Sequence, residues 1–175
     1  YAAGCHHLTF GFESGSPRIN KEMKKGYKFR EYDNEYAANV FKNCMDAGIQ
    51  TVLFLIIGYP TETKEDFQET MKFLKKYRKH IDAVYCMSTF ILSREMMNDD
   101  DPKWGKSRFH LRSARGGGGD MAPHPIEWES ASNTYEERLE RLEVFKKFAG
   151  ETDLTTISPR LPDGLSTPNQ GTTMD

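Results

Sequence analysis

The sequence predicts an α/β fold in which parallel strands alternate with helices. Three segments, at residues 8–12, 51–57 and 83–92, are apolar and are bounded by polar or turn residues, as strands are. Between them lie two segments whose apolar residues recur at helical spacing. This order implies parallel pairing through right-handed crossovers. Ligands bind at the carboxyl ends of the strands in such folds, so the loops after the strands form the candidate site.

The first strand, Leu8 to Phe12, ends on an acid, Glu13. Four cations follow within twelve positions of it: Arg18, Lys21, Lys24 and Lys25. The residues alone leave two interpretations open. The acid and the cations hold a ligand, or Glu13 only caps the turn of a loop, "ESGSPR", whose composition is that of an ordinary loop.

The first helix is expected at residues 34–47, with Asp33 as its N-cap and Gly48 as its left-handed stop. Its apolar positions share one side: Tyr36, Val40, Phe41, Cys44 and Ala47. The second strand, "TVLFLII" at residues 51–57, is apolar without interruption. Such a run is typical of a strand that is covered on both faces.

The second strand ends in "GYPTET", where Gly58 and Pro60 break it. Thr63 and Asp66 have the spacing of a capping box, which predicts the start of the second helix. We interpret Glu62 and Thr63 as helix-start residues, because acids and hydroxyls favour that end. The helix directs one set of residues inward: Phe67, Thr70, Met71, Leu74 and Tyr77.

The character of the chain changes after the third strand. Residues 106–132 contain "RGGGGD" and are expected to form a flexible linker. A helix is expected at residues 133–150, capped by Asn133 or Thr134 and stopped by Gly150. Its Leu139, Leu142 and Phe145 should pack against the rest of the fold. Residues 151–175 are rich in Thr, Ser, Pro and Gly and are expected to be disordered.

Composition excludes several classes of function. With 24 Lys and Arg against 26 Asp and Glu, the net charge of −2 gives no reason to expect nucleic acid or an anionic membrane as a partner. The longest apolar run, residues 52–57, is too short to span a bilayer. The three cysteines, Cys5, Cys44 and Cys86, are isolated and odd in number, which indicates a reducing compartment, the cytoplasm, and provides no metal site.

Two motifs in this order, "FGFESGSPRINKEMKKG" and "GYPTET", resemble the second half of a radical S-adenosylmethionine (SAM) domain. The pattern is most similar to that of radical SAM enzymes with an N-terminal cobalamin-binding domain. Methylthiotransferases and oxygen-independent coproporphyrinogen oxidases share the barrel more distantly. The resemblance covers roughly residues 1–105. It implies a partial (β/α)6 barrel, made of strands four to six with their helices.

The resemblance also implies a set of cofactor-binding residues in the two loops: Glu13, Ser14, Ser16, Arg18, Lys25 and Gly58. Glu13 would accept hydrogen bonds from the ribose hydroxyls or the amino group of SAM. Arg18 and Lys25 are the candidates for its carboxylate. A zwitterion needs both signs close together, and a carboxylate is best met by a fork of donors or a fixed ammonium. Gly58 would allow the backbone to approach the adenine or the sulfonium closely.

The implied activity is the cleavage of SAM by a 4Fe–4S cluster, with radical chemistry on a small-molecule substrate. Methyl transfer, cyclisation and C–H functionalisation are all compatible with it, and a flavodoxin or ferredoxin would supply the electron. The cluster motif CxxxCxxC is absent, and cysteines 39 and 42 positions apart cannot replace it. Because the chain begins at Tyr1 and leads straight into a strand, we expect a fragment whose cluster ligands, and possible cobalamin domain, lie upstream.

Two departures from the family pattern bear on the site. Thr61 stands where a glycine is usual, and "ILSREMM" lacks the Pro-Gly-Ser that is common after the last strand. The alternative function is a non-catalytic remnant or binding module that docks through exposed strand edges. An unrelated small α/β protein is disfavoured, because three strands bury too little on their own.

Overall fold

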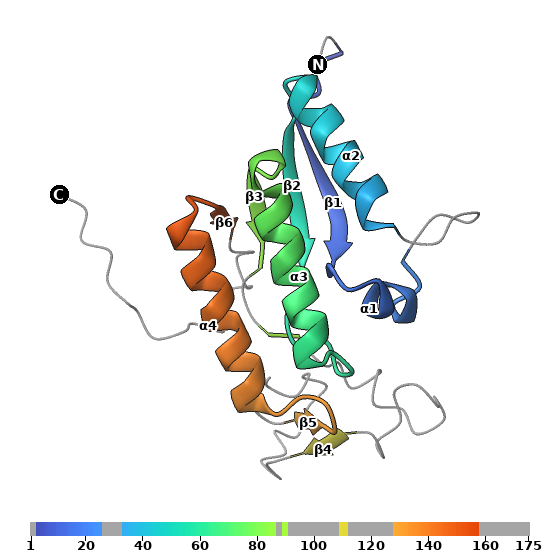
Figure 1. The fold of residues 1–175 in the computed structure, drawn as a ribbon, viewed down its shortest axis with the longest axis vertical. Coiled ribbons are helices and arrows are strands. Elements are labelled where there is room, and N and C mark those ends of the chain that lie inside the picture. The colour runs from blue at the N-terminus through green and yellow to red at the C-terminus, as the bar shows by residue number, and fades with distance from the viewer. Residues whose placement is uncertain (1–2, 26–32, 87–88, 91–108, 112–127, 158–175) are drawn as a thin grey trace, which may run out of the picture.

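The computed structural model describes residues 3–25, 33–86, 89–90, 109–111 and 128–157. Its main sheet has four strands in the order β1-β2-β3-β6, and every neighbouring pair is parallel (Figure 1). The strands are β1 (His7–Glu13), β2 (Gln50–Leu55), β3 (Ala83–Tyr85) and β6 (Thr155–Ile157). A second, antiparallel sheet pairs β4 (Phe109–Leu111) with β5 (Trp128–Ser130). The predicted α/β fold with a parallel sheet is therefore confirmed.

Four α-helices and one 3-10 helix accompany the strands in the described part of the chain: α1 (Pro17–Glu22), α2 (Asn34–Asp46), α3 (Lys64–Tyr77), η1 (Arg78–His80) and α4 (Tyr135–Glu151). Their starts follow the local sequence. Asp33 caps α2 by accepting a hydrogen bond from the Glu35 amide, and Thr63 and Asp66 form the predicted capping box of α3. Thr134, one of the two predicted residues, caps α4. Caps are predictable because they involve residues only two or three positions apart.

One face of the sheet carries the hydrophobic core. Phe10, Leu53 and Val84 are partners across β1, β2 and β3, so they point to the same side. Helices α2 and α3 cover this side (Figure 1), where the rings of Phe12 and Phe73 lie 4.5 Å apart. Each fully buried side chain of this size contributes about 1.5–3 kcal/mol relative to exposure.

The opposite face of the sheet is more open. Phe54 and Tyr85 are register partners on this side, and their rings stack with centroids 4.9 Å apart. Phe54 is 44% exposed, so the prediction that the second strand is covered on both faces is wrong at this residue. The described helices α2, α3 and α4 lie on the other side (Figure 1).

The third strand is shorter than predicted. Regular pairing ends at Tyr85, and an isolated bridge joins Ile57 to Thr89. Residues 87–88 and 91–92 of the predicted strand lie outside the described residues.

The C-terminal region differs most from the predictions. Residues 155–157 pair with β3, so the prediction of a disordered tail is wrong for residues 151–157. The prediction of a flexible linker is likewise wrong for β4 and β5. The rest of both segments lies outside the described residues. Helix α4 passes through Gly150 and ends at Glu151.

Helix α4 packs into the same core as the sheet, but with a different face from the predicted one. Leu142 and Phe145 are buried as expected, whereas Leu139 is 40% exposed. Two arginines, Arg138 and Arg141, are buried in its place. No helix in the described ranges is long and apolar enough to cross a membrane.

Candidate cofactor site at the strand ends

Glu13 ends β1 in an unusual conformation. Its φ of 62° lies in the left-handed region, and the register with β2 shifts between Phe10 and Glu13. A non-glycine residue in this region costs roughly 1–2 kcal/mol, and such strain is concentrated at functional sites. The Glu13 carboxylate accepts a hydrogen bond from Lys25, with Oε1 and Nζ 2.7 Å apart. The structure thus brings together two of the predicted residues that lie twelve positions apart.

The Glu13–Lys25 pair lies over Gly11 on the open face of the sheet. A Cβ at Gly11 would be 3.0 Å from Glu13 Oε1 and 3.3 Å from Lys25 Nζ. The Lys25 side chain is 37% exposed and the Glu13 side chain 13% exposed. The backbone amide of Lys25 donates to the carbonyl of the buried Asn20, which fixes where the lysine leaves α1. The Lys25 side chain is therefore accessible to a ligand, while its backbone is held by Asn20.

Ser14 and Ser16 are fully buried, and both bond to helix α3. Ser14 Oγ lies 3.0 Å from Thr70 Oγ1, and Ser16 Oγ donates to Asp66 Oδ1 at 2.6 Å. Gly15 between them packs so tightly that a Cβ would be 2.6 Å from the Cα of Thr70. These residues therefore attach the loop after β1 to the helix rather than line an open surface.

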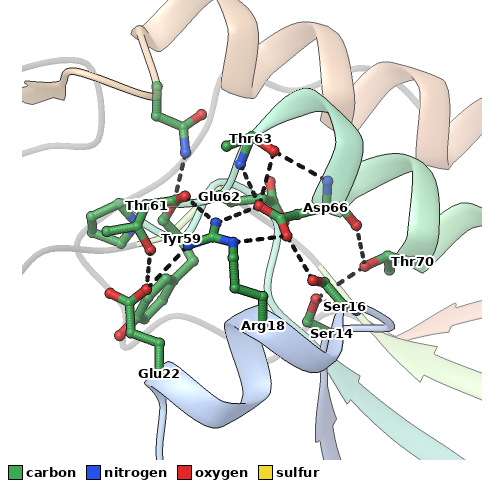
Figure 2. Close-up of polar contacts among 12 residues, drawn as sticks. Ser14, Ser16, Arg18, Glu22, Tyr59, Thr61, Glu62, Thr63, Asp66 and Thr70 are labelled. Atoms are coloured by element: carbon green, nitrogen blue, oxygen red, sulfur yellow. Dashed lines mark hydrogen bonds and ion pairs between the residues drawn. The ribbon is translucent and has the colours of Figure 1, made fainter.

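Arg18 is also held by protein groups, as Figure 2 shows. Its guanidinium donates to both carboxylate oxygens of Asp66 and to the carbonyl of Thr61, and it lies 3.4 Å from Glu22 Oε2. Burial opposes ionisation of Asp66, but hydrogen bonds from Arg18, Ser16 and the Thr63 amide outweigh it and lower the pKa of Asp66 to about 2. The structure brings Arg18 to the loop after β2 and does not bring it to the Glu13–Lys25 pair.

Gly58 has a φ of 78°, which a side chain would strain. A Cβ there would lie 2.5 Å from Cδ of Arg138 on α4. The close approach predicted for a ligand is, in this structure, made by the Arg138 side chain. The Gly58 amide donates to Glu62 Oε2 at 2.9 Å.

Glu62 was predicted only as a helix-start residue, and the structure gives it further contacts. It is 1% exposed and forms an ion pair with Arg141, whose Nη1 lies 3.1 Å from Oε2. Burial raises the pKa of Glu62 to about 7, against the opposing effect of the Gly58 amide and of Arg141. The only local signal is the motif "GYPTET", because Arg141 lies 79 positions away.

The site's charges suit one kind of ligand. A carboxylate beside an ammonium, at the carboxyl edge of parallel strands, presents both signs of charge, as a zwitterionic ligand requires. An iron–sulfur cluster does not fit the described residues, which contain no group of three His, Cys, Asp or Glu suited to a metal ion. Cys44 and Cys86 are buried, and burial raises the pKa of Cys86 to about 12.

Known proteins are similar to the N-terminal part of the chain. Residues 2–74 match the Radical SAM superfamily. A tRNA-2-methylthio-N(6)-dimethylallyladenosine synthase of Acetivibrio thermocellus is 38% identical over 90 residues, which is 51% of this chain and 17% of that protein. A threonylcarbamoyladenosine tRNA methylthiotransferase of Aquifex aeolicus is 41% identical over 70 residues, 40% of this chain and 16% of that protein.

The fold has a counterpart among solved structures. Coproporphyrinogen III oxidase from Escherichia coli, a radical SAM enzyme, superimposes with a TM-score of 0.56 over 86% of this chain and 28% of its own, at 18% identity. The chain spans less than a fifth of the length of the curated relatives named here. The strands β1 and β2, the loops after them and most of α3 fall within the matched segment. Through residues 2–74, the chain is similar to the Radical SAM superfamily.

Proposed function

We propose that this chain is part of a radical SAM enzyme and that Glu13 and Lys25 bind the methionyl end of SAM. The observation that carries the proposal is the ion pair between them, at the carboxyl edge of the sheet. Lys25 binds the SAM carboxylate as a fixed ammonium, and Glu13 accepts from the amino group or the ribose hydroxyls. In this proposal β1, β2 and β3 are strands four to six of a (β/α)6 barrel, and helix α4 and strand β6 are additions to it.

The remaining predicted residues support the site rather than touch the ligand. Ser14 and Ser16 hold the loop after β1 against α3, and Arg18 links that loop to the loop after β2. This fixes Glu13 and Lys25 before SAM arrives, which reduces the entropy lost on binding. SAM, when bound and reduced through a 4Fe–4S cluster, supplies the radical chemistry. We place the cluster ligands in the part of the enzyme that this chain does not span.

The substrate class is a small molecule in this proposal, with flavodoxin or ferredoxin as the reductant and the cytoplasm as the location. A second candidate is methylthiolation of tRNA, which the printed names of two relatives favour. The net charge of −2 favours the first only within the part of the enzyme that this chain spans, because tRNA binding needs a basic surface. A cobalamin domain has no support among these relatives and is not part of the proposal. Mass spectrometry for 2-methylthioadenosine in tRNA from cells with and without the enzyme separates the two candidates.

SAM binding tests the site directly. Glu13→Gln and Lys25→Ala should each weaken SAM affinity by about 1.5–3 kcal/mol, the range for a hydrogen bond to a charged group. Lys21→Ala, on the exposed side of α1, is the matched control and should leave the affinity unchanged. Affinity is measured anaerobically on the enzyme, together with formation of 5′-deoxyadenosine under reduction. Unchanged affinity in both Glu13→Gln and Lys25→Ala removes the site, and absence of SAM cleavage favours a non-catalytic binding module.

A further inference from the structure

The loop after β2, residues 58–62, is held by a helix that lies far away in the sequence. Arg141 on α4 donates from Nη1 to Glu62 Oε2 and to the Glu62 carbonyl, both at 3.1 Å. The same nitrogen lies 2.6 Å from Asn133 Oδ1, and Asn133 Nδ2 donates to the Tyr59 carbonyl at 2.6 Å. Both ends of the loop are therefore bound by the segment that contains α4.

These contacts are buried. Glu62 and Asn133 are each 1% exposed, and the Arg141 side chain is 8% exposed. Desolvation of two charges offsets much of their attraction, so a buried ion pair is weak evidence for a role in stability alone. Its geometry, however, permits few arrangements. Glu62 can bond the Gly58 amide and Arg141 at once only when the loop has the observed conformation.

A second arginine, Arg138, packs against the same loop. The aliphatic part of Arg138 lies against Gly58 and leaves no room for a Cβ. Its guanidinium stacks on Trp128, 3.7 Å from the ring centroid, and donates to the carbonyls of Asn133 and Trp128. Loop 58–62 is thus enclosed by α4 and β5 on one side.

The other side of the loop contacts the segment that carries the proposed SAM ligands. The Thr61 carbonyl accepts from Arg18, and Thr61 Oγ1 donates to Glu22 Oε2 at 2.7 Å. Arg18 and Glu22 belong to α1, which lies between Glu13 and Lys25 in the sequence. Polar contacts on Glu62 and on Thr61, which are adjacent in the chain, therefore join Arg141 to the segment of residues 13–25 (Figure 2 shows the part from Glu22 to Thr70).

We propose that Arg141, acting through Glu62, is a positioning residue for loop 58–62 and for segment 13–25, so that helix α4 sets SAM affinity without touching SAM. The proposal rests on the proposed function for its effect on SAM and on this chain's own contacts for its effect on the loop. Its prediction is specific: loss of the Arg141 contact loosens residues 13–25, which Arg141 does not touch.

Amide hydrogen exchange tests the coupling on the protein without any ligand. In Arg141→Met, amides in loop 58–62 and segment 13–25 should exchange at least about tenfold faster, because a buried hydrogen bond to a charged group is lost. Leu142→Ala is the matched control: it weakens the packing of α4 in the core and leaves the Glu62 contacts in place. The exchange rates of the two variants are compared under conditions in which both have lost the same unfolding free energy. Equal acceleration of segment 13–25 in both variants overturns the proposal, since Arg141 then contributes only stability.

SAM affinity is the second measurement, with SAM itself as the probe. Arg141→Met should raise the dissociation constant about fivefold or more, and Glu62→Gln should add little in the double variant, because both changes remove the same contact. Additive effects of the two substitutions on SAM affinity overturn the route through Glu62. If Glu13→Gln and Lys25→Ala both leave SAM affinity unchanged, the proposed SAM site is rejected, while the exchange result still decides the coupling.

Discussion

Glu13 combines a left-handed backbone conformation with a carboxylate that we propose as a SAM ligand. The sequence predicts a carboxylate at the end of the first strand, but its positive φ depends on the register shift against β2. Glu13→Gly should therefore keep or raise the free energy of unfolding, by up to about 1 kcal/mol, because glycine adopts this conformation without a Cβ clash. The same change should weaken SAM binding. Denaturant unfolding checks the first effect. A clear loss of stability would show that the folded protein itself depends on the Glu13 side chain.

Arg18 should behave as a structural residue. Its partner Asp66 has a side chain that is 6% exposed, and Arg18→Gln removes the positive charge beside it. We expect a loss of about 1 kcal/mol in unfolding free energy, reduced from the buried case because the arginine is half-exposed. Lys21→Ala on the same helix serves as the control. If Arg18→Gln has wild-type stability but binds SAM tenfold more weakly, Arg18 contacts the ligand as first predicted.

Glu62 should make stability depend on pH in an unusual direction. Its folded pKa of about 7 lies above the ordinary value of 4.5, so the folded protein binds the proton more tightly than the unfolded chain. The contribution is present below pH 4.5 and is lost as the pH rises through about 7, with a slope of at most about 1.4 kcal/mol per pH unit.

The charged and titratable groups that act on Glu62 do not change charge in this window. Asp66 lowers the acidity of Arg18 and so raises its pKa, Asp66 ionises near pH 2, and Cys86 stays neutral because burial raises its pKa to about 12. Glu62→Gln should therefore flatten the curve of unfolding free energy between pH 5 and 7.5. Identical slopes in the two proteins would contradict a raised pKa.

At the scale of elements, the sequence predicted features that depend on neighbouring residues and missed those that depend on distant ones. The starts of α2 and α3 and the Gly48 stop were predicted because each depends on neighbours within four positions. The face of α4 was predicted wrongly in part, because apolar periodicity cannot reveal that Arg141 pairs with Glu62. Strand β6 was missed because three residues, two of them threonine, become a strand only beside β3.

The correction at the C-terminal end can be tested by one core residue. Leu154, just before β6, is 4% exposed and belongs to the same hydrophobic core as the sheet. Leu154→Ala should lower the free energy of unfolding by about 2–4 kcal/mol, as for other buried leucines. Thr155→Ala, at an exposed neighbouring position, should cost at most about 0.5 kcal/mol. Equal small effects of the two substitutions would restore the prediction of a disordered tail.

At the scale of the whole molecule, the fold class followed from the order of strands and helices, whereas the site followed only in part. The pairing of Glu13 with Lys25 was within reach, since both charges lie near one strand end. The assignment of Arg18 and Gly58 to a ligand was not distinguishable in sequence from their contacts with Asp66 and Arg138. Those partners come from α3 and α4, and the approach of the helices is decided by packing across the whole sheet.

The open face of the sheet leads to a prediction about association. Phe54 and Tyr85 form a stacked aromatic pair on that face, and Phe54 is 44% exposed. Exposed aromatic surface beside an edge strand such as β1 favours self-association. We expect the 175-residue chain to associate at micromolar concentration and Phe54→Ser to reduce this association with little change in unfolding free energy. Val144→Ser on α4, where valine is 46% exposed, is the matched control and should leave association unchanged. Sedimentation velocity over a concentration series decides: equal effects of the two substitutions would mean that apolar exposure in general, and not this face, drives association.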